Sequence, residues 1–166
     1  MPVLSRLKAR HDESMQPNLE RIPGYDDARA EAIVRHAHDG VTAELMNGLD
    51  RRDVLALGRY GARQSTIALR ARSPEVLRAA LLATGIAEVR HEGDPRDLMI
   101  GVALHHVVAR QLGQSPAALF DDVAARLPDG PVPELFRESG ARQDITLQAF
   151  GWQLVQTANG LDLSPA

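Results

Sequence analysis

The chain contains no cysteine, and this absence excludes several kinds of chemistry. Disulfide bonds, thiolate nucleophiles, zinc ribbons and iron–sulfur clusters all depend on cysteine sulfur. The metal ligands left to consider are therefore histidine and carboxylate side chains. A cysteine-free composition also suits a reducing compartment, and we expect a cytoplasmic protein.

Long apolar runs are missing as well. The longest nearly apolar stretch, residues 98–109, is interrupted by two histidines. It is also shorter than the roughly 20 residues that cross a bilayer. The N-terminal segment places Arg6, Lys8 and Arg10 among its few apolar residues, which is unlike a signal peptide. We therefore expect neither a membrane span nor a membrane partner.

The chain also has little net charge and few aromatic residues. It carries 19 basic and 22 acidic residues, a formal charge of −3, and its aromatic content is 4%. The first value offers no strong electrostatic attraction for nucleic acid, and the second leaves few rings to stack on bases. These values argue against a nucleic-acid partner, and we expect a protein partner instead.

The small net charge hides an uneven distribution. Residues 50–78 hold 7 arginines against 3 acidic residues, a net +4, whereas residues 116–166 hold 3 against 7, a net −4. Two interpretations stay open. The two segments complement each other, within one molecule or across an oligomer, or the basic segment meets an acidic partner or phosphates.

Periodic apolar residues predict an all-α fold. A polar arm over residues 1–25 precedes a single helical domain over 26–160, and residues 161–166 form a short tail. No convincing strand pattern is present. We expect stacked antiparallel helical hairpins, as an irregular bundle or a short α-solenoid-like array, around a central apolar helix at 95–112.

Three helix starts share one signature at a regular spacing of 21 residues: Ser73-Pro74, Asp94-Pro95 and Ser115-Pro116. A Ser or Asp side chain can accept from a backbone N–H of the first turn, and proline suits the first helical position. Further helices are predicted over residues 26–45 with a bend at Gly40, 51–72, 116–127, 133–140 and 144–159.

The helix over 51–72 has two contrasting faces. One is built from small residues, Gly58, Gly61, Ser65 and Ala68, so a partner helix can approach it closely. The other carries Arg59, Arg63 and Arg70, which we take as the candidate interaction face.

A second candidate site combines Glu88 and His91, spaced as in di-metal helix bundles, with His105. The sequence has no second Glu-x-x-His, which argues against a di-metal site here. The simpler interpretation makes His105 a core histidine whose ring bonds a hydroxyl such as that of Thr84. His36, His38 and Asp39 diverge on a helix and would converge only if the helix ended a turn early.

The common nucleophile and nucleotide-binding motifs are absent from the sequence. We therefore expect a non-catalytic protein without a cofactor, which binds another protein or itself as an adaptor, inhibitor or regulator. The alternative is a helical enzyme, or a small-ligand or metal binder, with a pocket near Glu88, His91 and His105.

Overall fold

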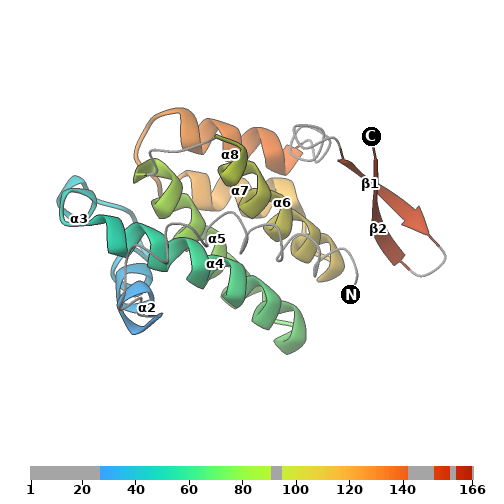
Figure 1. The fold of residues 1–166 in the computed structure, drawn as a ribbon, viewed down its shortest axis with the longest axis horizontal. Helices are drawn as coiled ribbons and strands as arrows, with labels where there is room; N and C mark the ends of the chain where they lie inside the picture. Colours follow the sequence, from blue (N-terminus) through green and yellow to red (C-terminus); the bar gives the residue numbers. More distant parts are fainter. Residues whose placement is uncertain (1–26, 91–94, 142–151, 158–159, 166) are drawn as a thin grey trace.

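A computed structural model describes residues 27–90, 95–141, 152–157 and 160–165. Most of this part of the chain is a helical bundle (Figure 1), which confirms the predicted fold class. Its helices are α2 (Asp27–His36), α3 (Ala43–Asn47), α4 (Arg51–Ala71), α5 (Pro74–Arg90), α6 (Pro95–Gln111), α7 (Pro116–Ala124) and α8 (Pro131–Ala141). Of these helices, none is both long enough and apolar enough to cross a membrane.

The three predicted helix starts are confirmed: α5, α6 and α7 begin at Pro74, Pro95 and Pro116. The hydroxyl of Ser73 accepts from the backbone N–H of Val76 at 3.3 Å. The hydroxyl of Ser115 likewise accepts from Ala118 at 3.2 Å. Each bond satisfies one backbone donor that the helix itself leaves unpaired. Asp94 lies outside the described residues, and a regular stack of hairpins stays a prediction.

Helices α4 and α5 lie side by side, joined by the short turn around Arg72 (Figure 1). The predicted small-residue face of α4 makes this contact. A Cβ built at Gly61 would lie 2.9 Å from the carbonyl oxygen of Ala80 and closer still to the hydroxyl of Thr84. Glycine is therefore required by the close approach of the two helices.

The centre of the bundle is shared by two helices. The described side chains of α6 at 102 and 104–109 are buried, as predicted for the central helix. Helix α5, however, packs against α2, α4, α6, α7 and α8, and its residues 80–87 are all buried. Apolar or small residues fill nearly every position of that stretch, so α5 has no solvent face there.

The expected single helix over 26–45 is two helices instead, α2 and α3. Gly40 has a φ of 155°, in the region that favours glycine, and it lies in the connection between them. Helix α2 is attached to α4 by ion pairs. Arg29 Nε donates to the buried carboxylate of Asp53 at 3.0 Å, and Arg63 pairs with Asp27.

The helix predicted over 144–159 is wrong over its described part. Residues Trp152–Thr157 form strand β1, which pairs antiparallel with β2 (Gly160–Pro165). The sequence carries the dipeptide Asn159-Gly160, which is typical of tight hairpin turns, where β2 begins. Apolar residues at every second position, Leu161 and Leu163, also fit a strand. The expected arm at 1–25 and the segment 142–151 lie outside the described residues.

Substituting Gly61 with alanine tests the close approach of α4 and α5. We expect Gly61→Ala to lower the free energy of unfolding by about 1–3 kcal/mol, because the new methyl group meets a backbone carbonyl that cannot rotate away. Urea denaturation measures the change. The matched control is Gly48→Ala, where the nearest atoms lie at 3.5 Å and φ is −82°. Equal effects of both substitutions would contradict a helix contact at Gly61.

Candidate functional site

His105, from the second candidate site, lies in the core rather than at a site open to ligands. Its side chain is fully buried. The Nε2 atom lies 2.6 Å from the hydroxyl of Thr84 on α5, and Nδ1 lies 2.8 Å from the hydroxyl of Ser65 on α4. The predicted contact with Thr84 is therefore confirmed. Sequence reasoning missed Ser65 as a partner, although it assigned Ser65 to the packed face of α4.

Proton counting gives each hydrogen bond of this cluster a direction. The Thr84 hydroxyl also lies 3.2 Å from the carbonyl oxygen of Ala80 and donates to it. A hydroxyl has one proton to donate, so Thr84 accepts from His105 Nε2–H. In the neutral ring Nδ1 is then an acceptor, and Ser65 donates to it. Every polar atom of the ring is satisfied without a ligand.

Of the other members of the metal hypothesis, only Glu88 belongs to the described residues. Glu88 is half-buried near the end of α5, and His91 lies outside the described residues. Helix α2 does end early, at His36, yet His36, His38 and Asp39 are all exposed. Across the described ranges, no three His, Asp or Glu side chains are close enough to hold a metal ion.

The neighbouring His106 is buried in a less satisfied environment. Its exposed fraction is 5%, and its ring packs against Phe120 with centroids 5.9 Å apart. Its Nδ1 atom has no hydrogen-bond partner among the described residues. Burial lowers the pKa of His106 from 6.5 to about 4, and the nearby charge of Arg110 acts in the same direction. The ring is therefore neutral at physiological pH.

The predicted arginine face of α4 is partly used inside the molecule. Arg63 is paired with Asp27 at the start of α2. Arg59 is half-buried, and Arg70 is exposed near the end of α4. The three residues follow one side of α4 as predicted, but at Arg63 the charge is already compensated.

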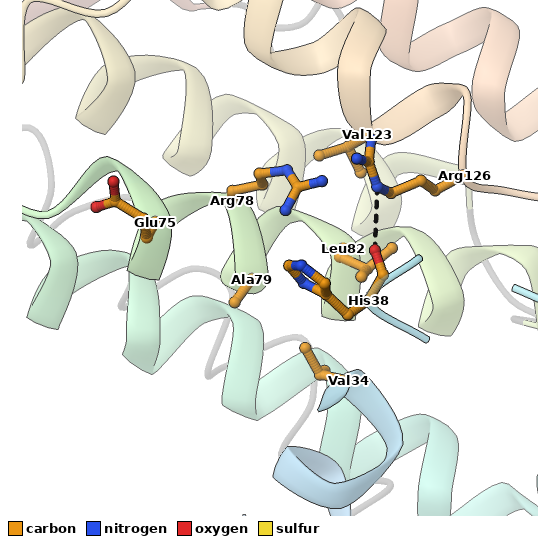
Figure 2. A pocket seen from close by; sticks show the side chains of 8 residues that line it. All are labelled: Val34, His38, Glu75, Arg78, Ala79, Leu82, Val123 and Arg126. Atoms are coloured by element: carbon orange, nitrogen blue, oxygen red, sulfur yellow. Dashed lines mark hydrogen bonds between the residues drawn. The ribbon is translucent and has the colours of Figure 1, made fainter. Parts of the chain in front are cut away.

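A pocket that the sequence did not indicate lies between α2, α5 and α7 (Figure 2). Its volume is about 90 Å³. The apolar part of its lining comes from Val34, Ala79, Leu82 and Val123. Its polar part comes from His38, Glu75, Arg78 and Arg126.

Hydrogen bonds hold the two arginines of the pocket in place. Arg78 Nε donates to the carboxylate of Asp122 at 2.6 Å, and Arg126 Nη1 donates to the same carboxylate at 2.7 Å. Arg126 Nε also donates to the carbonyl oxygen of His38 at 3.1 Å (Figure 2). The hydrogen bond from Arg78, followed by that from Arg126, lowers the pKa of Asp122 despite partial burial.

This cluster corrects an expectation of solvent exposure. The pattern of the helix after Pro116 predicts that Asp122 and Arg126 are exposed and solvated, but both are half-buried in the ion-pair cluster. Arg126 lies four residues after Asp122, so that pairing follows helical spacing. Arg78 lies 44 residues before Asp122, and no local pattern indicates that they meet.

Substitutions at Thr84 test the histidine cluster. We expect Thr84→Val to lower the free energy of unfolding by about 1–3 kcal/mol, because the buried His105 Nε2–H loses its acceptor. Thr66→Val is the matched control. Its hydroxyl lies 3.4 Å from the carbonyl of Ala62 on a half-buried face, so the loss should be within about 0.5 kcal/mol. Similar losses in urea denaturation would contradict a stabilising hydrogen bond between Thr84 and the buried ring of His105.

Acid denaturation tests the burial of His106. The unfolded chain takes up a proton at an ordinary histidine pKa near 6.5, the folded chain only near 4, so stability is complete above 6.5 and falls as pH drops toward 4. The expected loss is of the order of 3 kcal/mol. His106→Leu should remove this part of the pH dependence, whereas His36→Leu at an exposed position should keep it. An unchanged pH profile in His106→Leu would show that another group is responsible.

Comparisons with known proteins supply no function for this site. The chain matches no protein-family model, no curated protein and no solved structure. The geometry of the pocket and the charges around it are therefore the basis for a function.

Proposed function

We propose that this chain is a non-catalytic protein that binds another protein, as an adaptor, inhibitor or regulator. The observation that carries the proposal is the pocket between α2, α5 and α7, with an apolar floor and arginines already ordered at its rim. The proposal includes a cytoplasmic location, which the cysteine-free composition suits.

The size of the pocket supports a protein partner. Sites for drug-sized molecules have volumes of about 300–1,000 Å³, whereas this pocket has a volume of about 90 Å³. That volume suits a single aliphatic side chain. Protein interfaces concentrate their binding energy where one anchor side chain enters such a pocket and polar groups surround it.

The fixed positions of the two arginine side chains at the pocket support the same proposal. Ion pairs and a backbone hydrogen bond fix Arg78 and Arg126 before any partner arrives. Binding then costs less side-chain entropy than it would with freely rotating arginines, since immobilising each such side chain costs about 0.5–1.5 kcal/mol. We therefore favour the pocket over the face formed by Arg59, Arg63 and Arg70, of which Arg63 already has an ion-pair partner.

Filling the pocket tests the proposal. Ala79 lies in its lining and is half-buried, so the larger side chain of Ala79→Leu should fill the space that the partner's side chain would occupy. We expect capture of partner proteins in a pull-down from cell extract to fall at least about tenfold. Analytical ultracentrifugation of the same variant tests whether the partner is a second copy of the chain.

The matched control is Ala125→Leu, the same substitution at an exposed position after α7. It should retain capture, and both variants should keep the wild-type helical circular dichroism. Arg70→Glu probes the other surface in the same experiment. Equal capture by wild type and Ala79→Leu would contradict the pocket, and loss with Arg70→Glu alone would transfer the binding to the arginine face of α4.

A further inference from the structure

The cations of the pocket are gathered at one end. Arg78 and Arg126 both bond Asp122, and Figure 2 draws their guanidinium groups close to Val123. Glu75, the acidic residue of the lining, lies apart from them in the same view. Its carboxylate accepts from the hydroxyl of Ser73 at the start of α5. The pocket is thus positive at one end and apolar along its floor.

The arginines have more donors than the cluster uses. Within the described residues, Arg78 makes its hydrogen bond through Nε alone, and Arg126 uses Nε and Nη1. The Nη atoms of Arg78 and Nη2 of Arg126 make no hydrogen bond to this part of the chain. Two guanidinium groups also share the one carboxylate of Asp122, which leaves an excess of one positive charge at this end of the pocket, away from Glu75.

From these observations we propose that the pocket binds the C-terminal residue of a partner polypeptide, one with an aliphatic side chain such as leucine or valine. This inference rests on the proposed function. The terminal carboxylate accepts from the free Nη groups of Arg78 and Arg126. The side chain lies on the apolar floor, against Ala79 and Leu82.

The small volume of the pocket favours a chain terminus over an internal acidic residue. In a C-terminal residue, the carboxylate and the side chain are attached to the same Cα. An internal Asp or Glu carries its carboxylate at the tip of its own side chain, so the apolar group must come from a second residue. A pocket of about 90 Å³ has room for the side chain of one residue only. Guanidinium groups also suit the flat geometry of a carboxylate.

The remaining groups around the pocket do not reverse its charge. The pKa of Asp122 is lowered by both arginines, so its carboxylate stays ionised and already accepts from them. The side chain of His38 lies at the rim toward Ala79 in Figure 2. A ligand carboxylate therefore meets the arginine nitrogens that Asp122 leaves unused.

Peptide binding to the whole protein tests the inference. The probes are an acetylated tetrapeptide that ends in leucine with a free carboxylate, its C-terminal amide, the free acid that ends in glycine, and N-acetyl-leucine. Backbone amide shifts in NMR titrations up to about 10 mM peptide report both affinity and location. We expect the free leucine acid to shift amides of α5 and α7 at the pocket, and the amide and glycine peptides to bind at least about tenfold more weakly.

Protein variants separate charge from shape. Arg78→Gln should lower the affinity for the acid peptide about tenfold and leave the affinity for the amide peptide unchanged. Arg137→Gln is the matched control, since Arg137 also pairs through Nε with an aspartate of α7, Asp121, but outside the pocket. Ala79→Leu should abolish binding of both peptides.

The outcomes distinguish this inference from the proposed function. Equal binding of acid and amide, or no saturable binding of the acid, overturns the C-terminal ligand. Equal affinity of N-acetyl-leucine and the peptide supports it, because the pocket contacts the terminal residue alone. If either overturning result occurs while Ala79→Leu still abolishes partner capture, the protein-binding function stands and the partner uses another segment.

Discussion

One buried imidazole determines how the central helices fit together. His105 on α6 bonds Ser65 on α4 and Thr84 on α5, and its side chain is fully buried. Each polar atom finds its partner on another helix, so a sliding or rotating helix leaves buried groups unpaired, at about 1–3 kcal/mol for each group. Apolar packing tolerates small shifts, whereas these hydrogen bonds define one relative position. The cluster therefore sets the register of the bundle.

The positions of the pocket walls depend on this register of the helices. Helix α5 carries Thr84 toward His105, and it carries Arg78 and Ala79 toward the pocket. The opposite wall is fixed by reciprocal bonds, since Arg126 donates to the carbonyl of His38 and its own carbonyl accepts from the N–H of Val41. The connection after α2 is thus tied to the end of α7. A pocket whose walls are fixed in this way is organised before binding, which lowers the entropy cost of association.

The sequence predicted features that depend on neighbouring residues. Helix starts at prolines, the small face of α4 and the bond from His105 to Thr84 all follow from local spacing and from antiparallel helices of known rise. The contact between Arg78 and Asp122 depends on how α5 and α7 pack against each other. The spacing of residues along the chain does not predict this packing. The hairpin was missed for another reason. Apolar residues between 145 and 154 fit a helical period, whereas the strand pattern of β2 is limited to Leu161 and Leu163.

The distribution of charge shows why segment totals mislead. The basic segment 50–78 and the acidic segment 116–166 do meet, through Arg78 and Asp122. Arg63, however, is neutralised by Asp27, which belongs to neither segment. What attracts a ligand is the local count of donors against acceptors. At the arginine end of the pocket two guanidinium groups face the one carboxylate of Asp122, beside an apolar floor that water hydrates poorly. A carboxylate joined to an aliphatic group satisfies both conditions together, and neither a larger anion nor a purely apolar group does.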